Sequence, residues 1–189
     1  MSLPPLLIDV PRNPILAVGL PLSLGIATGF ITRTSKHSPD SLWYKSLQRP
    51  SWEPPRWAFP VVWPILYIGM GYASHLNVKS LDRTPPGLGR TKALRALKLY
   101  YAQLFLNQLW TPLFFGAGQQ SAAFANLVAL TGTVAAWGIT LADVEPKAAY
   151  IAVPYFAWTA YASVLNGYIW WQNTGQYYYQ KLIKKSKSS

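Results

Sequence analysis

The stretch LYYAQLFLNQLWTPLFFGAGQQSAAFANLVALTGTVAAWGITLA, residues 99–142, contains 44 residues and no charged side chain. A helix needs roughly 20 uncharged residues to cross a hydrocarbon core about 30 Å thick, so the stretch is long enough for two crossings. The segment GAGQQS at 116–121 is typical of a tight turn. We therefore interpret 99–142 as two membrane helices joined by a short turn.

Three further windows without charged residues, 13–32, 57–78 and 148–180, are each long enough for one helix. All 17 basic and 6 acidic residues lie outside the four windows. Alternating ten-residue segments, the pattern of a transmembrane β-barrel, do not occur. The predicted fold is therefore all-α: an integral membrane protein built as a five-transmembrane-helix bundle.

The chain is predicted to form one membrane domain over residues 1–175, followed by a basic C-terminal tail over 176–189. The second helix is placed at Pro54-Pro55 because prolines are tolerated in a first turn. Lys79–Thr91, rich in Pro and Gly, is interpreted as a flexible loop. No removable signal peptide is expected, because no basic region precedes the first short apolar run. The five helices are expected at about 14–32, 55–78, 95–115, 120–142 and 147–173.

The composition excludes several classes of protein. The net charge is +11, but the basic residues border the predicted spans, so we attribute them to topology and lipid and expect no nucleic-acid partner. Lys and Arg number eight on one predicted side and nine on the other, which leaves the orientation open. The chain has no Cys, which excludes disulfides, thiol catalysis and Cys metal sites.

Conventional catalytic and metal-binding patterns are missing from the sequence. The six acidic residues all lie in or beside predicted loops, and His37 and His75 are not at metal-ligand spacing. We expect no catalytic residue, no metal and no cofactor. His75 could be a haem ligand, but a lone histidine near a helix end is more often a hydrogen-bonded interface residue.

Aromatic and amide side chains recur at helical spacing. Such faces could enclose a flat apolar ligand, with amides orienting its polar edges. Alternatively, Asn and Gln bond helices to each other in membranes, and spacing alone favours this second interpretation. The two faces consist of Gln103, Asn107 and Thr111 in the third predicted helix, and of Trp158, Ala162, Leu165 and Ile169 in the fifth.

Four motifs carry a resemblance to a known family. They are Trp43-Tyr44-x-x-Leu47-x-Arg49-Pro50-x-Trp52-x-Pro54-Pro55, then Val62-Trp63-x-x-Leu66-Tyr67-x-x-Met70-Gly71, then Leu106-Asn107-x-x-Trp110-x-x-x-Phe114-Phe115-Gly116, and Pro154-Tyr155-x-x-Trp158-x-x-x-Ala162-x-x-Leu165-Asn166-x-x-Ile169-Trp170-x-x-Asn173. In order and spacing they resemble the TspO/MBR family, which comprises the tryptophan-rich sensory proteins of bacteria and the translocator protein, or peripheral-type benzodiazepine receptor. The resemblance extends from Pro21 to Asn173, and the first loop is most similar to eukaryotic members.

The resemblance implies a five-helix bundle whose pocket opens toward the first loop. Its implied ligands are porphyrins, such as protoporphyrin IX and haem-type tetrapyrroles, and cholesterol or other sterols. Trp63 and Trp158 are expected to stack on the ligand, and Arg56 either pairs with a ligand carboxylate or anchors the chain at the membrane interface. The implied ligand-binding set is Arg56, Trp57, Phe59, Val62, Trp63, Asn107, Trp110, Ala122, Ala125, Asn126, Trp158, Ala162 and Leu165.

Two features depart from the animal pattern. The cholesterol motif of the fifth helix is broken, because Val164 and Tyr168 are followed by Trp171 where a basic residue is expected. Ala122 replaces an aromatic wall residue and Asn126 replaces an aspartate. The pocket is therefore expected to be roomier and less charged than in animal members.

The resemblance implies a multi-pass membrane translocator or receptor in the mitochondrial outer membrane, or alternatively in the endoplasmic reticulum and secretory membranes. Two other functions stay open: a Trp-dependent porphyrin-degrading enzyme, and a ligand-regulated membrane scaffold. The pair Gly25-x-x-x-Gly29 could support a homodimer through close backbone approach. The expected partners are membrane lipid, the porphyrin or sterol ligand and a second copy of the chain.

Overall fold

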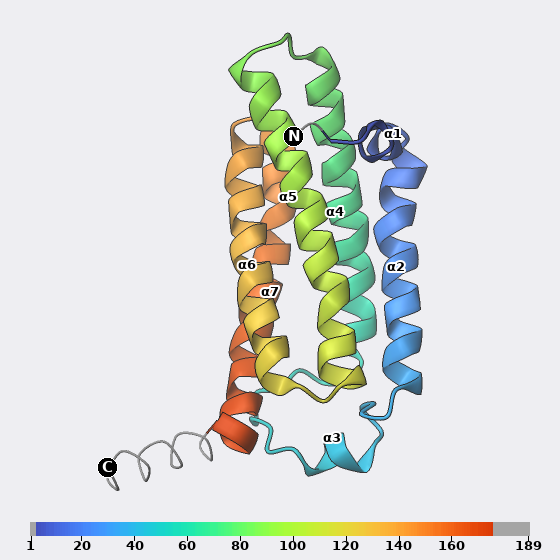
Figure 1. The fold of residues 1–189 in the computed structure, drawn as a ribbon, viewed down its shortest axis with the longest axis vertical. Helices are drawn as coiled ribbons and strands as arrows, with labels where there is room; N and C mark the ends of the chain where they lie inside the picture. Colours follow the sequence, from blue (N-terminus) through green and yellow to red (C-terminus); the bar gives the residue numbers. More distant parts are fainter. Residues whose placement is uncertain (1–2, 176–189) are drawn as a thin grey trace, which may run out of the picture.

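The computed structural model describes residues 3–175 of the 189, and this part of the chain contains helices and no strand. Five long helices lie side by side in an upright bundle (Figure 1). The basic tail over 176–189 lies outside the described residues. The elements are α1 (Pro5–Arg12), α2 (Pro14–Thr34), α3 (Leu42–Ser46), α4 (Ala58–Arg83), α5 (Leu88–Thr111), the π-helical turn η1 (Pro112–Gly116), α6 (Gln120–Ala142), α7 (Pro146–Trp170) and a second π-helical turn η2 (Trp171–Gly175).

Three of the long helical segments, α2, α6 and Pro146–Gly175, are long and apolar enough to cross a membrane. Only 11%, 33% and 28% of their most apolar windows are buried inside the molecule. Large apolar side chains such as Phe30 and Ile139 are therefore about 70% exposed. Exposure on this scale along a whole helix suits contact with lipid. α4 and α5 are not apolar enough to count as candidate membrane spans in the same way, although five crossings were predicted.

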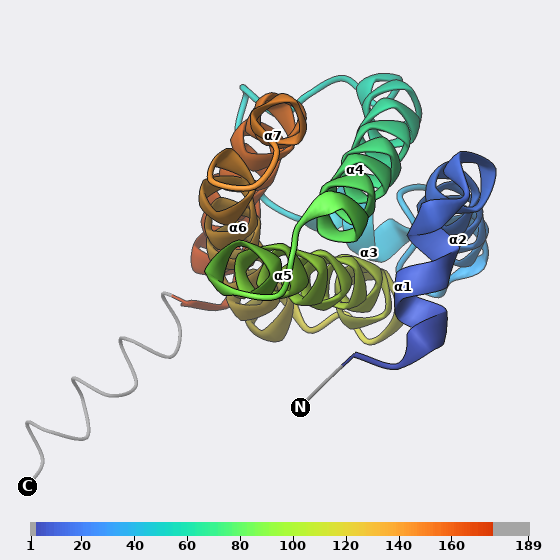
Figure 2. The same ribbon diagram turned by 90° about the horizontal axis from the view of Figure 1, so that it is seen from above.

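The bundle is built around α4, α5, α6 and α7, and α2 packs on the outside of α4 (Figure 2). The contact between α2 and α4 depends on glycine. A methyl group at Gly71 would lie 2.4 Å from the carbonyl oxygen of Ala17, and one at Gly25 would lie 2.2 Å from the Tyr67 ring. At Gly29 a methyl group would meet nothing within 4 Å. Gly25 thus packs against Tyr67 of the same chain, whereas Gly29 faces open space, so the two glycines do not form one exposed surface.

The segment Lys79–Thr91, predicted to be a flexible loop, is mostly helical. α4 continues to Arg83 and α5 already begins at Leu88, so only four residues connect them. The Pro85-Pro86 pair breaks the helix, and Gly87 adopts a φ of 149°, which favours glycine. Arg90 then donates to the carbonyl of Leu81 at 2.8 Å and secures the end of α4. The prolines and glycines of this segment correctly indicated a break between two helices, but they did not indicate how short the connection is.

The short helix α1, which the sequence patterns did not predict, is attached to α4 and α5 at one end of the bundle (Figure 1). The Nδ1 atom of His75 lies 2.8 Å from the carbonyl oxygen of Pro11, and the Tyr101 hydroxyl donates to the Leu7 carbonyl at 2.9 Å. Arg12 pairs with Asp82, which lowers the pKa of that carboxyl group. His75 is therefore a hydrogen-bonded residue that attaches α1, as the second interpretation of this histidine predicted.

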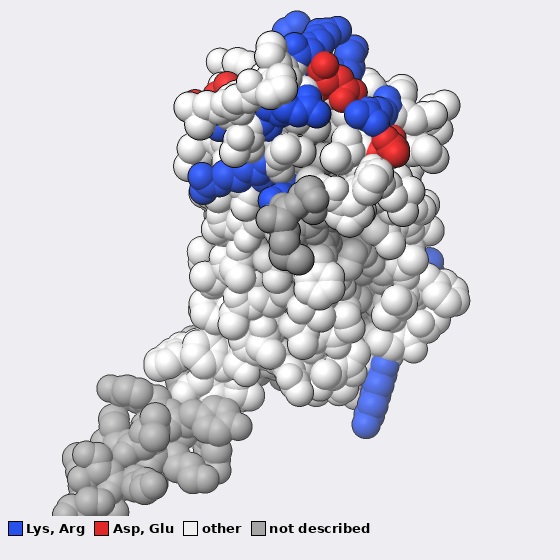
Figure 3. All heavy atoms as spheres, turned by 45° about the horizontal axis from the view of Figure 1, so that its top comes forward, with Lys and Arg blue, Asp and Glu red and all other residues white. Residues whose placement is uncertain are grey.

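Charged side chains are concentrated at the ends of the bundle. Figure 3 shows Lys, Arg, Asp and Glu gathered at the end that carries the α4–α5 connection, and a nearly uncharged surface beneath it. The first loop, over residues 35–57, lies at the opposite end with α3 (Figure 1). An apolar middle between two charged ends is the distribution that a bilayer requires.

Candidate ligand-binding site

The first loop is held in shape by a buried acid. Glu53, whose side chain is 14% exposed, forms an ion pair with Arg49 and accepts a hydrogen bond from the Tyr44 hydroxyl at 2.7 Å. The Arg49 guanidinium also lies over the Tyr44 ring, 4.9 Å from its centroid. Burial, together with Glu53, raises the pKa of Tyr44 above its ordinary value. The first loop is therefore a folded cover over this end of the bundle.

Two contacts tie the first loop to the helices at this end of the bundle, one to Asn173 of η2 and one to Tyr161 of α7. Asn173 accepts from the backbone N–H of Gln48 at 2.9 Å and donates to its carbonyl at 3.1 Å. The Tyr161 hydroxyl donates to the Trp52 carbonyl at 2.7 Å, and the two rings meet edge to face at 5.8 Å. Asn173 and Trp52 belong to the sequence motifs, but Gln48 and Tyr161 carried no signal that pointed to this role.

An aromatic wall, formed by Phe59 and Trp63 of α4 and Trp158 of α7, lies between these two helices. The Trp158 ring is 5.9 Å from Phe59 and 6.4 Å from Trp63, both in edge-to-face geometry. Trp63 in turn stacks on Tyr67 at 5.6 Å. The Nε1 atom of Trp158 is buried and has no hydrogen-bond partner among the described residues. Three of the predicted ligand residues are thus brought together.

Trp110 and Leu165 belong to a second, neighbouring cluster. Trp110 stacks on Phe114 at 5.1 Å, and its Nε1–H donates to the side-chain Oδ1 atom of Asn166 at 2.9 Å. Leu165 is buried with Phe114 and Ile169, and residues of the first loop pack against the same cluster. These two predicted residues therefore link the bundle to the first loop.

The predicted amide residues are already engaged in bonds between helices. Asn107 of α5 accepts from the Tyr67 hydroxyl at 2.7 Å and donates to the Tyr155 hydroxyl at 3.2 Å. Asn126 of α6 donates to the Leu106 carbonyl at 2.9 Å, while its own side-chain oxygen is buried and has no partner in the part of the chain that the structure describes. The interhelical interpretation therefore holds for Asn107, and Asn126 keeps one unused acceptor.

The remaining predicted residues lie around these groups. Val62 and Ala162 are half-buried and pack against the main core. Ala122 is half-buried, whereas Ala125 is exposed on α6. Trp57 is 68% exposed.

Arg56 lies at the rim of this region. It is exposed, pairs with Asp40 at 2.9 Å and donates to the Pro39 carbonyl at 3.2 Å. The first loop thus holds the guanidinium at the end of the bundle near the aromatic wall. Within residues 3–175, no three His, Asp or Glu side chains gather in a way that could hold a metal ion.

Comparison with known proteins places the chain in a family. A sequence profile described as the TspO/MBR family matches residues 17–172. The translocator protein of Homo sapiens is 39% identical over 165 residues, covering 87% of this chain and 93% of that protein. The translocator protein of Ovis aries is 44% identical over 134 residues, or 71% and 76% of the two chains. The tryptophan-rich protein TspO of Chlorobaculum tepidum is 36% identical over 152 residues, or 80% and 92%. This chain is an integral membrane protein that belongs to the TspO/MBR family.

Proposed function

We propose that this chain is a membrane receptor or translocator that binds porphyrins in the aromatic wall beneath the first loop, with sterols such as cholesterol as a second ligand class. The observation that carries the proposal is the Nε1–H group of Trp158. This group is buried beside Phe59 and Trp63 and has no hydrogen-bond partner within residues 3–175. Such donors are rare in native structures, and leaving one unpaired costs about 1–3 kcal/mol. A polar group on a flat ligand would remove that cost.

Porphyrin chemistry matches the rest of this region. The rings of Trp158 and Trp63 offer faces and edges to an aromatic macrocycle. Arg56 lies at the rim, where its exposed ion pair with Asp40 contributes about 0–1 kcal/mol. A ligand carboxylate could therefore replace Asp40 at little cost. Because the rings touch one another, the ligand has to separate α4 from α7 when it enters.

We also propose that α4 and α5 cross the membrane, which makes five crossings. They have 26 and 24 residues, about 39 and 36 Å in length, and they run beside the three apolar helices (Figure 1). The polar residues that lower their hydropathy, such as Asn77 and Gln103, are fully buried inside the bundle. A buried amide in this position does not meet lipid. By family resemblance the proposed location is the mitochondrial outer membrane, with the secretory membranes as the alternative.

The test is a titration of protoporphyrin IX into detergent-purified protein, followed by Trp fluorescence in the dark. We expect saturable quenching, and Trp158→Phe should weaken binding by about fivefold or more because the N–H donor is lost. Trp137→Phe is the matched control. The Trp137 nitrogen is also buried with no partner among the residues that the structure describes, but this side chain is fully enclosed in the core.

Each outcome of the titration decides a point. Equal losses of affinity in both variants, or quenching that never saturates, would contradict this site. The same samples under light test the enzyme alternative, because porphyrin in contact with Trp158 and Trp63 is placed for electron exchange with indole rings. Protein-dependent bleaching to a defined product, lost in Trp158→Phe, would establish a degrading enzyme instead of a receptor.

A further inference from the structure

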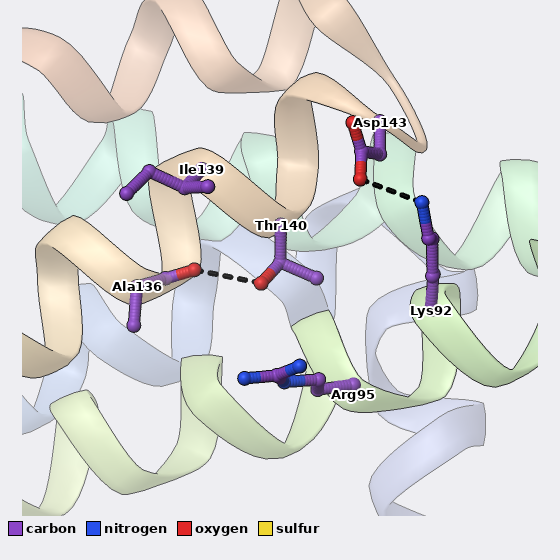
Figure 4. A pocket seen from close by; sticks show the side chains of 6 residues that line it. All are labelled: Lys92, Arg95, Ala136, Ile139, Thr140 and Asp143. Atoms are coloured by element: carbon purple, nitrogen blue, oxygen red, sulfur yellow. Dashed lines mark hydrogen bonds and ion pairs between the residues drawn. The ribbon is translucent and has the colours of Figure 1, made fainter.

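A charged hollow lies between α5 and α6 at the end of the bundle that carries the α4–α5 connection, far from the first loop. It has a volume of about 280 Å³. Basic side chains come from the first turns of α5, and the facing wall comes from the last turns of α6 (Figure 4). The lining residues are Lys92, Arg95, Ala136, Ile139, Thr140 and Asp143.

The hollow carries one uncompensated positive charge. Lys92 pairs with Asp143 at 2.7 Å, as the dashed line in Figure 4 shows. Arg95, one turn further along α5, forms none of the ion pairs found among the described residues. Its guanidinium lies on the α5 side of the hollow, across from Thr140 (Figure 4). A cation in this position, beside the apolar Ile139, suits an anion that arrives with an apolar body.

An apolar groove continues from this hollow on the other side of Ile139, between α6 and α7. Ile139 lines both spaces, and the groove has a volume of about 520 Å³. Small side chains, including Gly138, Ala142 and Ala152, leave the space open, and Phe156 closes its far end. None of the described residues that line the groove is charged.

The length of the groove matches one leaflet of a bilayer. It begins at Pro146, beside the α6–α7 connection, and reaches Phe156. The ten steps from Pro146 to Phe156 rise by about 15 Å along α7. This is half of a hydrocarbon core about 30 Å thick. The groove could therefore hold an extended acyl chain from the membrane surface to the bilayer centre.

We propose that the hollow and the groove together bind one anionic phospholipid, with its phosphate group at Arg95 and Lys92 and one acyl chain between α6 and α7. Both features are needed to identify the ligand. A soluble phosphate has no apolar chain that could fill the groove, and a sterol or a zwitterionic lipid carries no net negative charge that could pair with Arg95. The site is separate from the aromatic wall, so the inference does not depend on porphyrin binding.

Native mass spectrometry of the full chain in a neutral detergent tests the proposal, because it resolves protein with zero, one or two bound lipids. Dioleoyl phosphatidylglycerol and dioleoyl phosphatidylcholine would be titrated separately. We expect the first phosphatidylglycerol to bind about fivefold more tightly, since one basic side chain near the headgroup has roughly that effect. Arg95→Gln should remove the preference.

Arg83→Gln is the matched charge control. Arg83 is exposed on the last turn of α4, at the same end but outside the hollow, and its loss should leave the preference intact. Ala142→Phe fills the mouth of the groove and should weaken phosphatidylglycerol binding. Ala27→Phe, on an exposed position of α2, should not.

Four results would overturn the proposal. Equal affinity for the two lipids would remove the role of charge, and equal effects of Arg95→Gln and Arg83→Gln would indicate diffuse attraction to the basic end. Displacement of the lipid by an excess of glycerol 3-phosphate would identify a site for soluble anions. Unchanged binding in Ala142→Phe would show that the acyl chain does not use the groove.

Discussion

Asn107 is compatible with both interpretations of the polar face of α5, a ligand-binding face and a set of hydrogen bonds between helices. It is 5% exposed and joins three helices through the hydroxyls of Tyr67 and Tyr155. In an apolar interior these hydroxyls have no water to replace the amide. The side chain therefore has a structural role whether or not a ligand also reaches it, and loss of function in an Asn107 variant would not by itself identify a binding residue.

A double-mutant cycle separates these roles. We expect Asn107→Ala to lower the free energy of unfolding by about 1–3 kcal/mol, because the buried Tyr67 hydroxyl loses its acceptor, whereas the Tyr155 hydroxyl still donates to Gln103. Tyr67→Phe removes one of those hydroxyls. The double variant should then lose less than the sum of the two single variants, because they share one hydrogen bond. Unfolding followed by Trp fluorescence in detergent provides the measurement. Strictly additive losses would show that the bond contributes nothing.

At the scale of elements, uncharged windows predicted the five long helices but not their ends. A window closes at the first charged residue, yet α4 continues past Lys79 and α5 begins before Arg95. The reason is that an amphipathic helix end stays helical outside the lipid. The helix α1 was missed because its position depends on tertiary contacts such as His75 with the Pro11 carbonyl.

The candidate site, like the helices, could be predicted in part from the sequence. The aromatic wall followed from side-chain types at helical spacing and from family motifs. The ties from the first loop to α7 and η2 did not follow, because the groups they use on Gln48 and Trp52 are backbone atoms. Every residue has such atoms, so they leave no pattern in the sequence.

The tie at Asn173 predicts that the first loop can be loosened without unfolding the bundle. In Asn173→Ala the backbone N–H of Gln48 loses its acceptor. A hydrogen bond contributes about 0.5–1.5 kcal/mol net, so exchange of the Gln48 amide hydrogen should become roughly 2- to 13-fold faster. Hydrogen exchange read by mass spectrometry measures this. Ser46→Ala is the control, because the Ser46 hydroxyl donates to the Trp43 carbonyl within α3 and so does not tie the first loop to the bundle. Equal acceleration in both variants would mean that Asn173 does not hold the loop.

At the scale of the whole molecule, the chain places different chemistry at its two ends. The end with α1 carries the basic hollow, and Lys and Arg outnumber Asp and Glu there. Figure 3 shows these charged side chains gathered at this end. The opposite end carries the folded first loop over the aromatic wall. With five crossings, a ligand that enters beneath the first loop and a lipid that binds beside α6 would approach from opposite faces of the bilayer. The number of crossings therefore decides whether the two proposed sites face different compartments.

Single cysteines can measure this topology, because the natural chain has none that would react. Leu42 and Leu88 are 87% and 74% exposed, at the first loop and at the start of α5. Five crossings place Leu42→Cys and Leu88→Cys on opposite sides of the membrane, and place Ala117→Cys on the side of Leu42→Cys. If only α2, α6 and α7 crossed, all three would share one side. A membrane-impermeant maleimide, applied to sealed vesicles before and after detergent, distinguishes the two arrangements. We expect Leu88→Cys alone to react from the face opposite the other two, and labelling of all three from one face would reject the crossings of α4 and α5.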